Sequence, residues 1–274
     1  MRELSGKCAL ITGAAGGIGA AMAEEFAASG MKLVLTDIDG ARLDGLAGRL
    51  RGRGAEVLSL ARDVGSLARW EEIVAAAEAR FGAVHLLCNN AGITAMGWGI
   101  DDLPPDVWDL VLRVDLTSAY YGIRTVVPRM KAHGLGGHIV NTASMSGLRA
   151  MENHAVYVAA KAGLIGLSEA IRLELAPHGI GVTVLCPGAV ATEIVGNSDR
   201  VRGDAGAPPA PGTVVHPLAL AGAADPRDVA LAVRRAVEEE TFYLVTPNNA
   251  EAHVRARNEE LMVAFGKAGV KQDW

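Results

Sequence analysis

The sequence contains 274 residues, half of them apolar, and 26 Lys and Arg against 31 Asp and Glu leave a formal net charge of −5. A chain of this length and hydrophobicity can bury one large core, so disordered, collagen-like and coiled-coil architectures are excluded and a single domain over 1–274 is expected. There is no excess of basic residues and aromatic residues make up only 4%, so we expect no nucleic-acid partner.

Short, continuous apolar runs alternate along the chain with segments of helical periodicity. A strand that is apolar on both faces is covered on both faces, which is typical of a parallel sheet between two layers of helices. The alternation predicts an α/β fold, a Rossmann-like doubly wound seven-stranded parallel sheet with helices on both faces. The expected strands are Cys8–Thr12, Lys32–Thr36, Glu56–Leu60, Val84–Cys88, His138–Thr142, Gly181–Cys186 and Phe242–Val245.

Two connecting segments have clear helix boundaries. Ile18–Ser29 carries apolar residues at every fourth position and stops before Gly30, a residue typical of helix C-termini. Pro104–His133 is expected to form one long helix, with Asp106 as its N-cap. Pro128 lies inside this segment and should bend or end the helix, because proline cannot donate a backbone hydrogen bond.

Gly196–His216 departs from this pattern, because it is rich in Gly, Pro and Ala and has no period of either kind. A structureless stretch of this length in a compact domain is usually functional or disordered. We therefore expect a mobile lid at 193–217 that covers a substrate, with a plain surface insertion as the alternative.

The chain is expected to end in a C-terminal helical extension at 248–274. Val254, Leu261 and Phe265 can form an apolar stripe along it. We expect this stripe to cover the domain's own core, with a contact to another subunit as the alternative.

The three cysteines, Cys8, Cys88 and Cys186, are far apart and lie in apolar runs, as buried thiols of a reducing compartment do. Paired spacings typical of metal ligands do not occur, so no metal site is expected. The apolar runs are too short for a membrane helix, and the first seven residues lack the apolar segment of a signal peptide. A cytoplasmic protein without a membrane partner is expected.

A glycine-rich turn, Thr12–Gly19, follows the first expected strand directly, and a helix begins within it. Gly13, Gly17 and Gly19 would allow a tight turn and a close approach of the backbone to a pyrophosphate. The helix N-terminus offers free N–H groups and a partial positive charge to phosphates. A dinucleotide site is therefore favoured, and the alternative is a tight turn without a ligand.

Asp37 ends the second expected strand, some twenty residues after the glycines. A carboxylate there can accept hydrogen bonds from the ribose hydroxyls of NAD and would repel the extra phosphate of NADP. Two like charges about 4 Å apart cost about 4 kcal/mol at an effective dielectric constant near 20. Neither Ala15 nor Ile38 supplies a compensating base, so NAD is favoured over NADP. The alternative is that Asp37 merely starts a turn.

Tyr157 and Lys161 are four residues apart, which places a phenol and an ammonium group on one face of a helix. A nearby cation favours the phenolate and lowers the pKa of the tyrosine toward the range that a general acid or base needs. The alternative for this pair alone is a solvated helix face.

Five motifs follow one another in a fixed order. They are TGxxxGxG at Gly13, Gly17 and Gly19, Asn89-Asn90-Ala91-Gly92 after the fourth strand, Ser144 thirteen positions before Tyr157, the Tyr157/Lys161 pair, and Pro187-Gly188 after the sixth strand. This order resembles the compact branch of the short-chain dehydrogenase/reductase family. The match covers about residues 5–195, and the five motifs are specific only in combination.

The resemblance implies a role for each catalytic position. Tyr157 would exchange a proton with the substrate oxygen, and Lys161 would hold the nicotinamide ribose and lower the pKa of the tyrosine. Ser144 would orient the substrate carbonyl or alcohol, whereas Ser146 has the wrong spacing to Tyr157. Asp115 occupies the position where the family usually has an asparagine that holds a water molecule. A carboxylate can accept from this water but cannot donate when ionised, so we expect activity with a changed pH profile.

The resemblance also implies a dinucleotide site. Asp63 and Val64 match a pair that contacts adenine, and 90–92 match a segment beneath the cofactor. Val190 and Thr192 match contacts to the nicotinamide carboxamide. The implied cofactor residues are Gly13, Ala15, Gly17, Ile18, Gly19, Asp37, Ile38, Asp63, Val64, Asn90, Ala91, Gly92, Tyr157, Lys161, Pro187, Gly188, Val190 and Thr192.

The positions expected to line the substrate side are mostly apolar. This composition favours a hydrophobic secondary alcohol or ketone, although methionines at such positions also serve ordinary core packing. The expected substrate-lining residues are Thr94, Met96, Trp98, Met145, Met151 and Ile194.

The resulting hypothesis is an oxidoreductase that transfers a hydride between NAD and such a substrate, with Tyr157 as general acid and base. An NADP-dependent ketone reductase of the same family and a non-catalytic NAD-binding sensor remain the alternatives. The family's usual dimer joins the helices near 106–133 and 155–178, where Ala159, Gly163 and Leu167 suit close packing. A homodimer or homotetramer is therefore expected.

Overall fold

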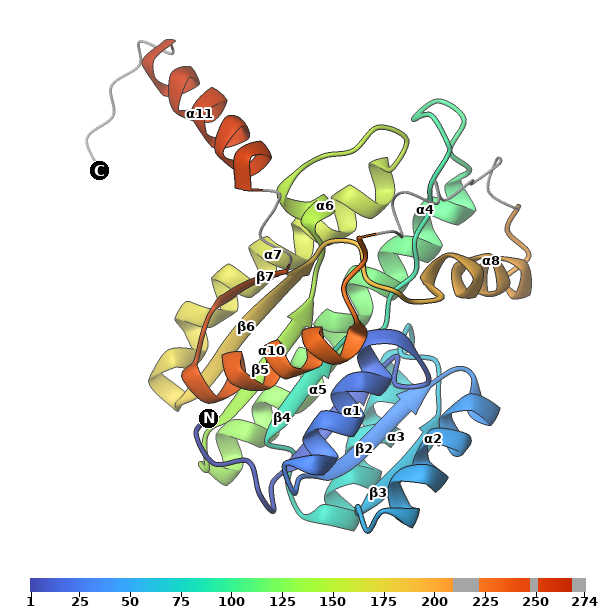
Figure 1. Cartoon of the computed structure of the whole chain (residues 1–274), viewed down its shortest axis with the longest axis vertical. Coiled ribbons are helices and arrows are strands. Elements are labelled where there is room, and N and C mark those ends of the chain that lie inside the picture. The colour runs from blue at the N-terminus through green and yellow to red at the C-terminus, as the bar shows by residue number, and fades with distance from the viewer. Residues whose placement is uncertain (209–221, 247–250, 268–274) are drawn as a thin grey trace.

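Seven parallel strands form one sheet in the order β3-β2-β1-β4-β5-β6-β7 (Figure 1). The computed structural model describes residues 1–208, 222–246 and 251–267. Every neighbouring pair of strands is parallel, which confirms the predicted fold class. The strands are β1 (Cys8–Thr12), β2 (Lys32–Asp37), β3 (Val57–Ala61), β4 (Leu86–Asn89), β5 (Gly137–Thr142), β6 (Ile180–Pro187) and β7 (Tyr243–Thr246).

Helices cover both faces of this sheet. Buried side chains of α1, α2 and α10 pack together on one face, and those of α3, α5 and α7 pack on the other. The helical elements are α1 (Gly17–Ala28), α2 (Gly40–Gly52), α3 (Leu67–Phe81), α4 (Pro105–Leu112), η1 (Arg113–Thr117), α5 (Ser118–His133), α6 (Met145–Leu148), α7 (Ala155–Leu175), η2 (Ala176–His178), α8 (Ile194–Asp204), α10 (Pro226–Glu239) and α11 (Glu251–Lys267).

Successive side chains of the central strand β1 point alternately into the two hydrophobic cores, one on each face of the sheet. Ala9 and Ile11 belong to the core under α1, whereas Cys8 and Leu10 belong to the core under α3. All five residues of the strand are buried. A strand with two buried faces must be apolar at consecutive positions, which is why its sequence shows no period of two.

The chain reverses direction across the sheet between β3 and β4. After β1 it proceeds outward to β2 and β3, and it then returns to place β4 on the other side of β1. The loops that follow β1 and β4 therefore leave the sheet in opposite directions and open a crevice at the carboxyl ends of these strands. Such a switch point is where open α/β sheets bind ligands.

The expectation of a structureless stretch at Gly196–His216 is wrong for its first part. Residues 194–204 form helix α8, although 209–217 lie outside the described residues. Polar side chains stabilise the buried face of this helix: Ser198 and Arg202 are both almost fully buried. Because the buried residues of this helix are polar, its sequence shows no apolar periodicity from which a helix could be predicted.

The expected single helix over 104–133 is divided by a π-helical turn, Arg113–Thr117. The N-cap is Pro104 rather than Asp106, which lies in the first turn. Pro128 does not end the helix, because α5 continues to His133.

Side-chain hydrogen bonds help to carry α5 through its proline. Thr125 Oγ1 donates to the carbonyl oxygen of Tyr121 at 2.8 Å, and Arg129 Nη1 donates to the carbonyl oxygen of Thr125 at 2.7 Å. Both bonds engage backbone carbonyls in the two turns that precede Pro128.

Helix α11 projects away from the body of the molecule (Figure 1). The expectation that its apolar stripe covers the domain's own core is wrong, since Leu261 and Phe265 are 56% and 72% exposed. Across 1–208, 222–246 and 251–267, no helix has the length and the apolar character needed to cross a membrane.

Candidate active site

The glycine turn after β1 is too crowded for side chains. A Cβ on Gly13 would lie 2.8 Å from the Cα of Ala91, and one on Gly19 would overlap the carbonyl oxygen of Gly13. Gly13 and Gly17 also have positive φ angles of 62° and 54°, which side chains disfavour. The turn therefore requires glycine for its own geometry, and it leaves its outer surface as bare backbone.

Hydrogen bonds from the ends of β1, β4 and β5 hold this turn in place. Thr12 Oγ1 accepts from the N–H groups of Asn90 and Ala91, both at 2.9 Å. Asn90 Nδ2 donates to the carbonyl oxygen of Thr12 at 3.1 Å, and Thr142 Oγ1 donates to Asn90 Oδ1 at 3.2 Å. Asn90 thus joins three strand ends into one rigid platform.

The N-terminus of α1 fits a phosphate group. Its N-cap is Gly16, which has no side chain to cap the N–H groups, and its first turn, Gly17–Ala20, holds no acidic residue. The free N–H groups and the positive end of the helix dipole are therefore available to an anion. A bare glycine backbone at the same place allows a pyrophosphate to approach closely, so the residues present fit a dinucleotide.

Asp37 lies against the glycine turn, because its Oδ2 accepts from the N–H of Ala15 at 2.9 Å. Its Oδ1 accepts from the N–H of Asp39 at 3.0 Å. A carboxylate oxygen accepts more than one hydrogen bond, so both oxygens can still accept from ribose hydroxyls. Ile38 is 51% exposed beside it, as an adenine-facing residue would be.

Arg42 is a base near this turn that its sequence position does not reveal. Its guanidinium lies over Gly16, where a Cβ would come within 2.9 Å of Nη2. It is already paired, however, since Nη2 lies 2.7 Å from Glu193 Oε2. Arg200 is likewise paired with Asp39 at 3.2 Å.

Asp63 and Val64, the two residues expected at the adenine, are held in place by hydrogen bonds to other residues of this chain. Asp63 Oδ2 accepts from Arg113 Nη1 at 2.9 Å, and its Oδ1 accepts from the N–H of Gly65 at 2.8 Å. Val64 is buried, and its carbonyl oxygen accepts from the indole N–H of Trp70 at 2.9 Å. These contacts fix the backbone at the edge of the crevice.

The residues expected at the nicotinamide follow β6. Pro187 ends that strand, and the N–H of Gly188 donates to the carbonyl oxygen of Thr246 in β7. Val190 forms an isolated bridge with Ala224. Thr192 reaches the glycine turn, because a Cβ on Gly17 would lie 3.0 Å from its Cγ2.

Three of the four expected catalytic residues meet at a buried ion pair. Lys161 Nζ lies 3.1 Å from Asp115 Oδ2, and both side chains are almost completely buried. The same Nζ donates to the carbonyl oxygen of Thr142 at 2.9 Å and lies 5.6 Å from the ring centre of Tyr157. The spacing of Tyr157 and Lys161 along α7 places both on one face, as predicted.

The π-helical turn η1 presents Asp115 to this cluster. Its Oδ1 accepts from the N–H of Ile93 at 2.8 Å, while its Oδ2 faces the Lys161 ammonium and has no other partner among the described residues. Gly92 is packed against the pair, where a Cβ would lie 3.2 Å from Lys161 Nζ and 3.3 Å from Asp115 Oδ2. π-helical turns are frequent at functional sites.

Ser144 completes the cluster from the N-cap of the short helix α6. Its Oγ accepts from the N–H of Ser146 at 3.0 Å, and its hydroxyl is near enough to Tyr157 to lower the pKa of the phenol. Ser146 instead points its hydroxyl at the sulfur of Met151, 3.6 Å away. The structure therefore brings Ser144, and not Ser146, to the tyrosine.

The electrostatics of the cluster differ from the expected lowering of the tyrosine pKa. Burial raises the pKa of Tyr157, and this outweighs the lowering by Lys161 and by the Ser144 hydrogen bond. The Asp115 carboxylate raises the pKa of Tyr157 further, because it offsets the charge of the lysine. Burial also raises the pKa of Asp115, although Lys161 opposes it. For Lys161, burial lowers the pKa, but Asp115 and Tyr157 together bring it above its ordinary value.

The expected substrate-lining residues fall into two groups. Thr94 and Trp98 are buried, and Met96 and Met145 are partly buried. The remaining two, Met151 and Ile194, are 46% and 37% exposed.

Arg202 is a residue on this side that sequence reasoning missed. Its buried guanidinium lies 5.6 Å from the ring centre of Trp98, and its Nη1 donates to the carbonyl oxygen of Thr94. Asp199 pairs with its Nη2. A single arginine in a segment rich in Gly, Pro and Ala carried no signal that could have found it.

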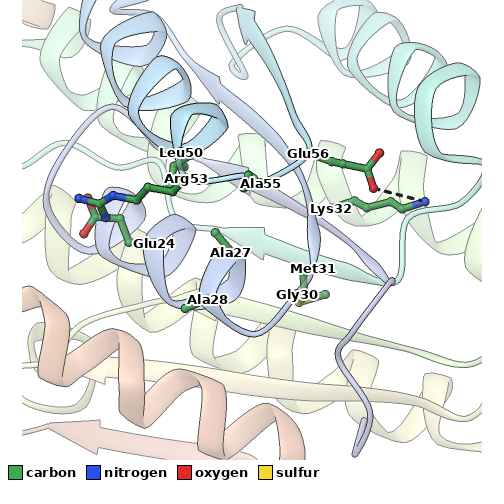
Figure 2. Close-up of a pocket in the computed structure, with 11 residues that line it drawn as sticks. Glu24, Ala27, Ala28, Gly30, Met31, Lys32, Leu50, Arg53, Ala55 and Glu56 are labelled. Carbon is green, nitrogen blue, oxygen red and sulfur yellow. Dashed lines mark ion pairs between the residues drawn. The ribbon is translucent and has the colours of Figure 1, made fainter.

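A pocket of about 370 Å³ lies elsewhere and does not belong to this site (Figure 2). It is lined by the ends of α1 and α2 and by the residues that lead into β2 and β3, with Glu24 and Arg53 on one side and the Lys32–Glu56 pair on the other. These are the amino ends of the strands, whereas the glycine turn and Asp37 lie at the carboxyl ends. Within the described ranges, no group of three His, Cys, Asp or Glu side chains could hold a metal ion.

Comparison with known proteins agrees with this geometry. A family profile described as short chain dehydrogenase matches residues 7–202. The crystal structure of a short-chain dehydrogenase/reductase from Burkholderia phymatum in complex with NAD is 35% identical, with a TM-score of 0.90 and coverage of 96% of this chain and 97% of that one.

Two curated relatives extend this likeness. D-beta-hydroxybutyrate dehydrogenase from Cupriavidus necator is 36% identical over 202 residues, which cover 73% of this chain and 76% of the relative. 1-deoxy-11-beta-hydroxypentalenate dehydrogenase from Streptomyces exfoliatus is 31% identical over 258 residues, which cover 94% and 88%. The chain therefore belongs to the short-chain dehydrogenase/reductase family, a family of oxidoreductases with dehydrogenases that act on hydroxyl groups.

Proposed function

We propose that this chain is an NAD-dependent dehydrogenase that interconverts a hydrophobic secondary alcohol and its ketone, with Tyr157 as the general acid and base. The observation that carries the proposal is the cluster in which Tyr157 lies beside the buried Lys161–Asp115 pair, with the Ser144 hydroxyl near enough to lower the pKa of the phenol. A non-catalytic nucleotide-binding protein would not need all three side chains in one place.

The dinucleotide would be held along the crevice at the carboxyl ends of the strands. The N–H groups at the start of α1 would bind its phosphates, and Asp37 would accept from the adenosine ribose. When bound, the nicotinamide ring accepts the hydride from the alcohol or returns it to the ketone. Lys161 would donate to the nicotinamide ribose from its buried position.

Tyr157 would handle the proton at the substrate oxygen. In alcohol oxidation the phenolate takes the hydroxyl proton as the carbon loses its hydride, and in ketone reduction the phenol returns the proton. Ser144 would donate to the same oxygen and orient it. Asp115 would hold the ammonium group of Lys161 in place, and its Oδ2 could accept a further hydrogen bond from a water molecule.

The charges at the crevice support a preference for NAD. Asp37 would repel a 2′-phosphate, and Arg42 and Arg200 are each engaged by a carboxylate. The likeness to a relative solved with NAD points the same way.

The substrate class rests on the apolar residues around the cluster. Ile93, Trp98 and Val156 belong to one buried apolar group, and Val156 directly precedes Tyr157 in α7. The curated relatives named above are dehydrogenases of hydroxy compounds, which is consistent with an alcohol substrate.

We also propose a homo-oligomer that joins copies through α5 and α7. Tyr120 and Leu173 on these helices are 47% and 70% exposed. Gly163 is not available for this contact, since a Cβ there would lie 3.1 Å from Leu116 of the same chain. Light scattering at micromolar concentration should give a multiple of the chain mass, and a monomer mass would contradict the proposal.

The function is tested by steady-state reduction of NAD and of NADP with aliphatic, alicyclic, steroidal and benzylic secondary alcohols. We expect turnover with NAD on at least one class and none with Tyr157→Phe. Binding of NAD without turnover on any alcohol or ketone would instead support a non-catalytic sensor.

A further inference from the structure

Polar contacts join the first turn of α2 to helix α8 across the mouth of the glycine turn. Arg42 pairs with Glu193 at 2.7 Å and donates to Asn197 Oδ1 at 3.3 Å. Arg200 pairs with Asp39 at 3.2 Å and also donates to Asn197 at 3.3 Å. The two elements are separated by about 150 residues of chain, so their meeting is a tertiary contact. We call these five side chains the α2–α8 bridge.

The bridge lies directly over the surface that the phosphates of a dinucleotide would occupy. The Arg42 guanidinium covers Gly16, the N-cap of α1. Thr192, which precedes Glu193, is packed against Gly17. The bridge therefore closes the crevice at the point where the helix N-terminus is exposed.

The inner side of α8 is attached in a different manner. Ser198 Oγ accepts from the N–H of Thr94 at 2.8 Å, and Arg202 donates to the carbonyl oxygen of Thr94. Both contacts are buried. Helix α8 is thus anchored to the substrate side by buried bonds and fastened to the cofactor side by exposed ones.

Exposed ion pairs are weak and open readily, because water competes for both partners. The side chains of Arg42, Arg200 and Glu193 are 38%, 48% and 70% exposed. The buried anchor would therefore persist while the bridge opens and closes.

We propose that Arg42 and Glu193 are positioning residues that hold α8 closed over a bound dinucleotide, and that their ion pair opens before the dinucleotide leaves. The proposal rests on dinucleotide binding at Gly13–Gly19, as described under Proposed function. The bridge acts on the rate of cofactor release and leaves the proton transfer at Tyr157 unchanged.

Release of NADH, followed by the change in its fluorescence after displacement with excess NAD in a stopped-flow instrument, tests this. Glu193→Gln removes the charge and keeps the shape, and we expect NADH to leave roughly 2- to 5-fold faster, the range of one exposed pair. The wild-type rate should rise with ionic strength, and the rate of the variant should rise less steeply, since only the Arg200–Asp39 pair remains in the bridge. Single-turnover hydride transfer should be the same in both.

Glu238→Gln is the control for removing a carboxylate from an ion pair away from the crevice, because Glu238 pairs with Arg234 on α10 at 2.7 Å. Its NADH release should equal that of the wild type. The double variant Arg42→Glu, Glu193→Arg exchanges the two charges and should restore slow, salt-sensitive release.

The outcomes separate this proposal from the proposed function. Failure of the wild-type protein to bind NADH would overturn both. Normal NADH binding with unchanged release and unchanged salt dependence in Glu193→Gln would overturn the bridge alone. Slower release in Glu193→Gln would overturn it as well, since a freed Arg42 would then be holding the phosphates by itself.

Discussion

Two ion pairs at the same crevice illustrate opposite uses of charge. The Arg42–Glu193 pair is the shorter, at 2.7 Å against 3.1 Å for Asp115–Lys161. The shorter pair is nevertheless the weaker, because its side chains are 38% and 70% exposed while those of the other pair are 4% and 0% exposed. Water screens the first pair and is excluded from the second. Burial, and not distance, decides which of the two is fixed.

Burial of the Asp115–Lys161 pair also has a cost in free energy. Two charges taken out of water lose their hydration, and only their mutual attraction and added hydrogen bonds offset the loss. Ile93 and Thr142 supply such bonds to Asp115 and Lys161 through their backbones. The exposed pair needs no such support, and it can therefore open and close without disturbing the fold.

We expect the largest effect on turnover from removing the phenolic hydroxyl of Tyr157, which lies beside the buried pair. Tyr157→Phe deletes the phenolic proton and keeps the ring over Lys161, so kcat should fall by about 10²- to 10⁴-fold or more. Steady-state turnover measures this, and an unchanged dissociation constant for NADH shows that the crevice is intact. Turnover near the wild-type level would assign the proton transfer to another group.

Breaking the buried pair should destabilise the protein. Lys161→Met leaves the Asp115 carboxylate buried without its partner, which typically costs about 3 to 5 kcal/mol. Urea unfolding without cofactor measures the free energy of unfolding. The double variant Lys161→Met, Asp115→Asn removes both charges and should recover most of the loss. If the double variant is as unstable as the single one, packing of the lysine stem rather than charge is responsible.

At the cofactor side, Asp37→Asn should change cofactor choice. Removing this charge relieves the repulsion of a 2′-phosphate, and the ratio of kcat/KM for NADP to that for NAD should rise by roughly 10- to 100-fold, within the energy of one screened charge pair. Adding Glu193→Gln frees Arg42 and should raise the ratio further. A ratio that stays constant in both variants would place the 2′-phosphate away from Asp37.

The smallest effect is expected from Asp115→Asn, which removes one charge and keeps the shape. Turnover should persist. The carboxylate raises the pKa of Tyr157, so its removal lowers that pKa, and the acid limb of the pH profile for alcohol oxidation should move to lower pH. The profile of kcat between pH 5 and 10 measures the shift. A complete loss of turnover would indicate a specific role for the carboxylate.

The sheet could be predicted from the sequence because its signal is local. Runs such as those at 8–12 and 32–37 are buried on both sides, so each reveals itself without its neighbours. Helix α8 could not be predicted, because the contacts that anchor Ser198 and Arg202 to the rest of the domain come from Thr94, about 100 positions away. The π-helical turn could not be predicted either, because no local sequence pattern indicates it.

Some features of the candidate site could likewise be predicted from the sequence, and others could not. Resemblance indicated Tyr157, Lys161, Ser144 and Asp115, and these residues lie together in the structure. The direction of the tyrosine pKa was missed, because burial is a property of the whole fold. Arg42 was missed because its nearness to Gly16 depends on the packing of α2 and not on its place in the sequence.

The π-helical turn at Arg113–Thr117 has a consequence for chain length. Such a turn corresponds to one extra residue in an α-helix, and each residue rotates the helix by about 100°. Buried Val107 before the turn and Ile123 after it still face their own cores, so the extra residue is absorbed within the turn itself. A single deletion there would let both helices keep their faces while it turned Asp115 away from Lys161. The position of the Asp115 carboxylate thus depends on the number of residues in this segment as well as on the identity of the buried Asp115.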